Sequence, residues 1–149
     1  MANDNKKSGV FPCYENQFAV GAAGETTPSD TIADMETYGV AIENGIEEWH
    51  SYGEEGWVKR LMTAKSVKIS VKGKRNLGDA GNDDIASVWM ANGHAAERNF
   101  LWTFPDGSTV LFKNAVINVT ALNAADATNV GPLEFEVQSN GKPVYTPAA

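Results

Sequence analysis

The sequence predicts a mainly β protein: an antiparallel β-sandwich or barrel of six or seven strands with one short flanking α-helix. Two observations lead to this prediction. Short segments either alternate apolar and polar residues or are rich in β-branched and aromatic residues, and turn signals separate them. Only one segment has the spacing and the capping residues of a helix. Such a succession indicates a sandwich or barrel in which the helix covers one open end or face.

The 149 residues are expected to form a single domain, residues 16–149, preceded by a flexible N-terminal arm over residues 1–15. The single cysteine, Cys13, excludes an intrachain disulfide. The N-terminal residues lack the apolar run of a secretory signal. No apolar stretch approaches the roughly 20 residues of a membrane-spanning helix. We therefore expect a soluble intracellular product, or one released without the secretory route.

The N-terminal third contains two expected strands and one segment without a period. Residues 16–23 (NQFAVGAA) and residues 31–42 (TIADMETYGVAI) have the composition of strands. Residues 43–57 (ENGIEEWHSYGEEGW) hold five glutamates and the aromatic residues Trp49, Tyr52 and Trp57, but neither the strand nor the helix period. We expect a long loop there, and loops of this length are typically functional or disordered.

The middle of the chain carries the most secure strand and the helix signal. Residues 64–75 (AKSVKISVKGKR) alternate strictly, as in a half-buried strand, with Val67, Ile69 and Val71 on one face and Lys68, Ser70 and Lys72 on the other. In the helix, Asn82 or Asp83 could cap the N-terminus and Gly93 could end the last turn. One helix face would then bury Ile85, Val88 and Trp89.

The C-terminal part is expected to form two hairpins. Residues 98–104 (RNFLWTF) and 108–122 (STVLFKNAVINVTAL) flank Pro105-Asp106-Gly107, a turn sequence. Residues 132–139 (PLEFEVQS) and 142–147 (KPVYTP) flank Asn140-Gly141, a strong short hairpin signal. The alternation directs Leu133, Phe135 and Val137 inward, and Glu134, Glu136 and Gln138 to the other face.

The net charge of −7 is distributed unevenly along the chain. Residues 43–55 contribute −5, and residues 59–75, which we call the basic strip, contribute +7 without any acidic residue. Overall acidity disfavours nucleic acid as a bound partner, because such affinity depends on neutralising phosphates. A cationic strip beside an anionic segment favours self-association between copies. The alternative is an ordinary solvated surface of mixed charge.

Signals for catalysis, metals or cofactors are weak. The two histidines, His50 and His94, have no metal-binding spacing, and no glycine-rich segment has the lysine of a phosphate-binding loop. Cys13 has no histidine near it in sequence. We therefore expect no enzyme, no catalytic or metal site and no cofactor.

Three stretches resemble the major tail protein, the tail tube subunit of long-tailed, non-contractile bacteriophages. They are residues 56–86 (GWVKRLMTAKSVKISVKGKRNLGDAGNDDIA), 100–122 (FLWTFPDGSTVLFKNAVINVTAL) and 133–147 (LEFEVQSNGKPVYTP). The order of the pieces carries the resemblance, which extends over residues 16–147. It runs from an acidic loop through a basic alternating strand, a short capped helix and a Pro-Asp-Gly hairpin to a final strand pair.

The resemblance implies a structural protein of the virion tail, made in the cytoplasm of the bacterial host. Such subunits form hexameric rings that stack into a tube, and one sheet of each subunit joins its neighbours around a lumen that conducts the duplex DNA genome without binding it specifically. Its partners would be copies of itself and other tail proteins, such as the tape measure, the initiator and the terminator. The resemblance brings no catalytic residues.

The resemblance also suggests roles for surface residues. Aromatic residues of the types that dominate interfaces would bury against an adjacent subunit, and the glutamates beside them would meet the basic strip. This intersubunit set comprises Glu47, Glu48, Trp49, Tyr52, Trp57, Lys68, Lys72, Lys74 and Arg75. Glu134 and Glu136 would line the lumen, because carboxylates let DNA slide. The alternatives are that the tryptophans pack on their own subunit and that the two glutamates lie on the outside of the tube.

Two other functions remain open from the sequence. A β-sandwich carbohydrate-binding module could use Trp49, Tyr52, Trp57 and Trp102 to stack on sugar rings, although no aromatic row is evident on one strand face. The tube protein of a contractile injection machine would have the same ring architecture.

Overall fold

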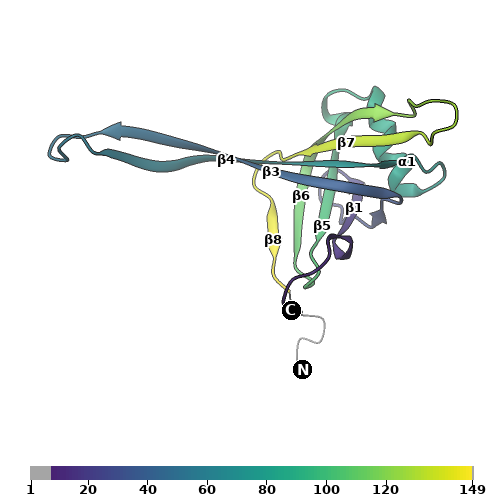
Figure 1. Ribbon diagram of the computed structural model, residues 1–149, viewed down its shortest axis with the longest axis horizontal. Coiled ribbons are helices and arrows are strands. Elements are labelled where there is room, and N and C mark those ends of the chain that lie inside the picture. Colours follow the sequence, from purple (N-terminus) through teal and green to yellow (C-terminus); the bar gives the residue numbers. More distant parts are fainter. Residues whose placement is uncertain (1–7, 149) are drawn as a thin grey trace.

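The computed structural model describes residues 8–148. Within that range the chain is mainly β, with eight antiparallel strands hydrogen-bonded into one sheet and a single α-helix (Figure 1). In chain order the elements are β1 (Gln17–Ala22), β2 (Asp30–Thr31), β3 (Met35–His50), β4 (Val58–Lys74), α1 (Ala80–Ser87), β5 (Glu97–Thr103), β6 (Thr109–Leu122), β7 (Pro132–Gln138) and β8 (Val144–Thr146). The predicted fold class is confirmed. The strand number is eight because the short strands β2 and β8 are both present.

The sheet turns around β6, so that its two halves enclose the core. The strand order is β2-β1-β5-β6-β7-β4-β3, and β8 pairs with β6 beside this path. Rings from the two halves meet in the core: the centroids of Phe100 on β5 and Phe135 on β7 are 6.4 Å apart. Ile85 of α1 is fully buried in the same cluster, so the helix covers one side of the core. Each such side chain contributes about 1.5–3 kcal/mol by its burial.

The alternating pattern of β4 and β7 is confirmed. Ile69 and Val71 are buried on β4, as are Leu133, Phe135 and Val137 on β7. The polar residues between them lie on the opposite face of both strands, where they are half-buried or exposed.

The helix begins earlier than the sequence predicts. Asp79 is the N-terminal cap, and its side chain accepts a hydrogen bond from the Asn82 backbone N–H at 3.0 Å. Asn82 and Asp83 therefore lie within the first turn, and their prediction as caps is wrong. The α-helix ends at Ser87, and Val88–Met90 continue as a 3₁₀ turn. Because this turn breaks the 3.6-residue period, Trp89 is 60% exposed, and its predicted burial is also wrong.

The end of this helical region also differs from the prediction. Gly93 has a φ of 62°, but it begins a separate 3₁₀ turn, Gly93–Ala96, and does not cap α1.

The two predicted hairpins have different outcomes. Pro105-Asp106-Gly107 joins β5 to β6, and the Gly107 N–H donates to the Phe104 carbonyl at 3.0 Å, so this hairpin is confirmed. The chain also turns at Gly141, where φ is 92°, but β8 pairs with the start of β6 and not with β7. Pro143, which follows this turn, has no N–H to donate to a neighbouring strand. The predicted pairing of the last two strands is therefore wrong.

The expected loop over residues 43–57 is mostly strand. Residues 43–50 belong to β3, and only residues 51–57 form the turn that leads into β4. β3 and β4 form one long hairpin that projects far beyond the rest of the molecule (Figure 1). The loop prediction is wrong for residues 43–50.

The predicted N-terminal arm is only partly covered by the structure. Residues 1–7 lie outside the described residues, whereas Cys13–Glu15 form a 3₁₀ turn just before β1. No helix within residues 8–148 combines the length and the apolar composition required to cross a membrane.

Candidate subunit interface

The distal part of the β3–β4 hairpin extends away from the body, and we call residues 43–66 the hairpin arm. β7 pairs with β4 only from Lys68 onward, and the Ser139 N–H then bonds to the Val67 carbonyl. Beyond that point, among residues 8–148, each arm strand pairs only with the other strand. The ladder contains a bulge at Thr63, because Gly45 is opposite Ala64 but Ile46 is opposite Met62.

No residue of the hairpin arm is buried. Large apolar side chains are nevertheless concentrated on it: Ile46, Trp49, Tyr52, Trp57, Leu61 and Met62 are all exposed. Ile46 and Met62 lie opposite each other on one face, whereas Trp49 lies on the other face, next to Lys59. A two-stranded hairpin that packs on nothing is marginally stable at best in water. Exposed apolar residues gathered on one element are typical of surfaces that contact another molecule.

The tryptophans of the intersubunit set lie on the arm and not on the body. Trp57, the last residue of the turn before β4, is 76% exposed and Trp49 is 40% exposed. Neither tryptophan is among the residues that pack against the core of the body. Tyr52 lies in the turn at the tip and is fully exposed.

The charged members of the intersubunit set are partly engaged within their own chain. Glu48 accepts a hydrogen bond from Arg60 of the same arm at 2.9 Å. Lys74 pairs with Glu36 on β3, also at 2.9 Å. Arg75 is only 12% exposed and pairs with Asp83 of its own chain at 2.7 Å.

The two candidate lumen residues share a face with the lysines. Lys72 on β4 lies directly opposite Glu134 on β7, and Lys68 lies opposite Gln138. Directly opposed residues of antiparallel strands project to the same side of the sheet. Glu134 and Glu136 therefore do not form an acidic wall separate from a lysine-bearing boundary. The polar face of β4 and β7 carries both signs of charge.

Glu136 also accepts hydrogen bonds from two neutral amide side chains on this face. Its Oε1 atom accepts hydrogen bonds from Asn118 Nδ2 and from Gln138 Nε2, both at 3.3 Å. This polar surface, together with β3 and the second half of β6, is the face of the sheet opposite the core.

The four strands β6, β7, β4 and β3 form a part of the sheet with an open edge on each side. On one side β3 pairs with β4 alone among the described strands. On the other side β5 pairs with β6 only as far as Val116, so residues 117–122 of β6 have β7 on one side and no strand described on the other. Open edges present unpaired N–H and C=O groups that can pair with another chain.

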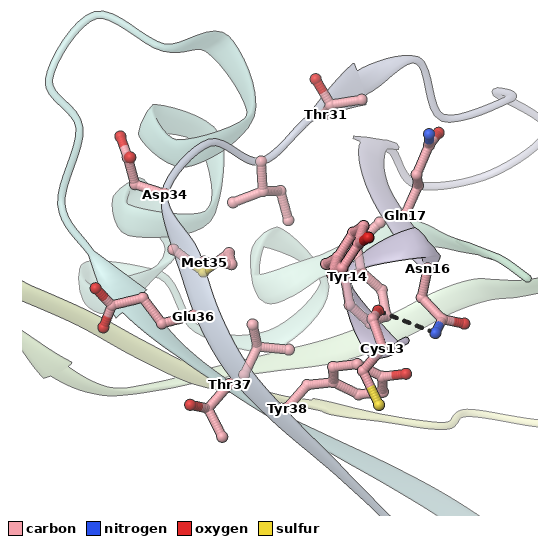
Figure 2. A pocket seen from close by; sticks show the side chains of 13 residues that line it. Cys13, Tyr14, Asn16, Gln17, Thr31, Asp34, Met35, Glu36, Thr37 and Tyr38 are labelled. Atoms are coloured by element: carbon pink, nitrogen blue, oxygen red, sulfur yellow. Dashed lines mark hydrogen bonds between the residues drawn. The ribbon is translucent and has the colours of Figure 1, made fainter. Parts of the chain in front are cut away.

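A pocket of about 490 Å³ lies at the base of the hairpin, between the Cys13–Glu15 turn and the start of β3 (Figure 2). Its two carboxylates are both engaged, because Asp34 accepts from Asn76 at 2.6 Å and Glu36 from Lys74 at 2.9 Å.

The titratable groups of this pocket suggest no reaction. Burial, reinforced by the Cys13 thiol, raises the pKa of the Tyr38 phenol. Within residues 8–148, no group of three or more histidine, cysteine, aspartate or glutamate side chains is placed to hold a metal. We assign no chemistry to this pocket.

The aromatic residues that could stack on sugar rings do not share a surface. Trp102 is packed in the body, where its Nε1 donates to Asn16 Oδ1 at 3.0 Å and its ring centroid lies 4.6 Å from that of Phe104. Trp49 and Trp57 lie on the hairpin arm, far from it (Figure 1). The structure therefore gives no support to a carbohydrate-binding row.

No family model and no curated protein sequence matches the chain. Solved structures do match in shape. One is a chain from the tail of an empty gene transfer agent particle, refined with C6 symmetry: the TM-score is 0.71 at 17% identity, over 93% of this chain and all of that chain. Another, from the sheath–tube complex of an extracellular contractile injection system, has a TM-score of 0.63 at 15% identity, with 92% and 91% of the two chains covered.

A third match comes from the tube-terminating cap of the anti-feeding prophage. Its TM-score is 0.60 at 12% identity, and the alignment covers 99% of this chain and all of that chain. At these identities the similarity shows a shared fold. The chain has the fold found in gene transfer agent tails and in contractile injection assemblies.

Proposed function

We propose that this protein is the structural subunit of a tail tube and assembles as stacked hexameric rings. The observation that carries the proposal is the hairpin arm, which exposes apolar side chains on both faces and packs on no other part of residues 8–148. The shared fold supports the same assignment, and the C6 symmetry of the gene transfer agent tail supports six subunits in a ring. The role is structural and involves no catalysis.

The ring forms through the open edges of the sheet. The portion β6-β7-β4-β3 contains four antiparallel strands, so β3 runs opposite to β6. When copies are repeated around an axis, β3 of one subunit meets residues 117–122 of β6 in the next, and that junction is antiparallel like the other pairs. One contact repeated by rotation closes into a ring, whereas the contact between rings continues without closing.

The hairpin arm docks on an adjacent subunit. Trp49, Tyr52 and Trp57 are of the residue types that carry most of the energy of protein interfaces. Glu47 next to Trp49 and Glu54 and Glu55 at the tip then approach lysines of the partner.

The polar face of β4 and β7 lines the lumen through which duplex DNA passes. Duplex DNA carries one negative charge per about 1.7 Å, so a purely lysine wall would retain it. On this face Glu134 and Glu136 alternate with Lys68 and Lys72, and the charges offset one another. The wall then attracts DNA only weakly. A protein with this role is a component of the virion tail. The neighbours in that tail are copies of this chain and the tape measure, initiator and terminator proteins.

The assembly state of the purified protein tests the proposal. Electron microscopy and size-exclusion chromatography at rising concentration should show rings or tubes. Trp57→Ala should weaken subunit association by at least about 30-fold, as for a central interface residue, while its thermal unfolding stays like that of the wild type.

Trp89 provides a matched control. It is an exposed tryptophan (60%) that lies outside the hairpin arm, at the end of the helical region, and Trp89→Ala should assemble normally. Compact monomers at every concentration and in the presence of an initiator complex would contradict the proposal, as would normal tubes from Trp57→Ala.

A further inference from the structure

The hairpin that ends in the arm is held to the body along β4, whose residues 68–74 pair with β7, and at its two roots. One root is the chain before β3, residues 31–34, and the other is the end of β4 with residues 74–76. The first turn of α1 lies against both roots. The Lys74 N–H donates to the Asp34 carbonyl at 2.8 Å, which joins the two roots directly.

Asn82 connects these roots through a single side chain. Its Nδ2 atom donates to the Ala33 carbonyl at 3.1 Å and to the Lys74 carbonyl at 3.0 Å, one on each root. Its Oδ1 atom accepts from Arg75 Nη1 at 2.8 Å and from the Asn76 N–H at 3.0 Å. The residue is fully buried, and all four hydrogen bonds that its amide can make are formed.

Two further side chains complete this connection. Asp79 Oδ2 accepts from the Ala33 N–H at 3.1 Å while it caps α1 through the Asn82 N–H. Asn76 Nδ2 donates to Asp34 Oδ2 at 2.6 Å. We call Asp34, Asn76, Asp79 and Asn82 the root clamp.

The helix and the two roots are closely packed at the root clamp. A Cβ atom added to Gly81 of α1 would collide with the Thr31 carbonyl on the β3 root. One added to Gly73 of β4 would collide with the backbone at Asp34 and Met35. The helix and the two roots are thus in close contact, and a displacement of either root away from α1 must disrupt the bonds of Asn82.

We propose that Asn82 is a positioning residue that sets the direction of the hairpin arm relative to the body. β3 has 16 residues between its root and the turn at the tip, roughly 50 Å at the usual rise per residue, so a tilt of about 10° at the root moves the tip by about 9 Å. Such a displacement would misplace Trp57 in an interface that is packed as closely as a protein interior. The relevance to assembly rests on the proposed function, whereas the positioning itself is a property of the single chain.

Asn82→Asp tests this inference, because the aspartate keeps the shape but cannot donate to both carbonyls. Nitroxide labels on Glu54→Cys at the tip and Val116→Cys on β6, in a Cys13→Ser background, report the tip-to-body distance by double electron–electron resonance. Dilute monomer is used, so the result does not depend on assembly. Asn82→Asp should broaden the distance distribution severalfold relative to the Asn82 protein.

Asn99 supplies the matched control. It is also fully buried, and its Nδ2 donates to the carbonyls of Gly24 at 2.8 Å and Thr26 at 2.7 Å, away from both roots. Asn99→Asp should destabilise the fold to a similar extent and leave the distance distribution narrow. If Asn82→Asp keeps a narrow distribution, or if both variants broaden it equally, the inference is overturned.

A milder variant keeps the test decisive if Asn82→Asp does not fold. Asn76→Ala removes the bond to Asp34 and leaves Asn82 in place, and it should broaden the distribution by a smaller but measurable amount. An unchanged distribution would contradict the role of the clamp. Failure of the wild type to form tubes would overturn the proposed function and leave this measurement valid.

Discussion

The guanidinium of Arg75 binds side chains of the first turn of α1. It donates to Asn82, to the Asp83 carboxylate and to the Asn76 carbonyl, at 2.7–3.1 Å, and it is 12% exposed. A largely buried guanidinium is tolerated because these acceptors replace its hydration. In the sequence the same arginine is one of several basic residues on an alternating strand. Its different role depends on the strand ending one residue before it, a boundary that alternation alone does not define.

Asp83 should make stability depend on acid pH. The hydrogen bond from Arg75 and that from the Gly78 N–H, with partial opposition from desolvation, lower the pKa of its carboxyl. A lowered folded-state pKa gives stability that is present above the unfolded value of about 3.9 and is lost as pH falls through the folded value. The free energy of unfolding in urea, measured from pH 6 to pH 2, should fall less steeply below about pH 4 in Asp83→Asn than in the wild type. If the free energy of unfolding falls with the same slope below about pH 4 in both proteins, this assignment is contradicted.

At the scale of the element, the hairpin arm explains why the strand period is absent from residues 43–50. Strict alternation arises when one face of a strand is buried in its own chain. Both faces of the arm are exposed, so glutamates and apolar residues occur on each, and the bulge at Thr63 shifts the register further. The strands with one buried face, β4 near Ile69 and β7, were predictable, whereas the arm strands were not. Within residues 43–57, Gly53 and Gly56 were the residues from which the turn between the two arm strands could have been predicted.

Shortening the arm should separate folding from assembly. Replacing residues 45–64 with Asn-Gly keeps the proximal hairpin and provides a two-residue turn. None of the removed residues is buried, so the thermal midpoint should change by only a few degrees, about the effect of 1 kcal/mol in a domain of this size. Chromatography should show only monomers. Rings formed by the shortened protein would mean that the sheet edges alone sustain lateral association.

At the scale of the whole molecule, the fold class followed from the sequence, whereas the arrangement of charge did not. The strand and helix segments and the Pro-Asp-Gly hairpin were identified because each is a local pattern. The opposition of Lys72 and Glu134 depends on the register between β4 and β7, which are separated by about sixty residues of chain. The pairing of β8 with β6 is equally non-local. Sites that depend on such pairings need the structure.

Reversing the charge of β7 should convert the polar face into one that holds DNA. In Glu134→Lys/Glu136→Lys the carboxylates beside Lys68 and Lys72 become cations. Tubes of this variant should retain duplex DNA in a filter-binding assay at about 50 mM salt and release it by about 200 mM, as expected for contacts that neutralise phosphates. Wild-type tubes should retain little.

The matched control makes the same charge change at the other end of the molecule. Glu54→Lys/Glu55→Lys alters the arm tip, which is not on the polar face of β7. Any tubes that it forms should not retain DNA in the lumen. Equal retention by both double variants would show that net charge, and not its place, decides the outcome.

The acidic tip of the hairpin arm has one more consequence. The turn over residues 51–57 contains two carboxylates, Glu54 and Glu55, and no lysine or arginine. Two tips brought together would oppose like charges, so a symmetric dimer formed through its arms is disfavoured. If copies add head to tail, as in the proposed tube, the filament has two different ends. The charge of this single turn would then favour a polymer with a direction.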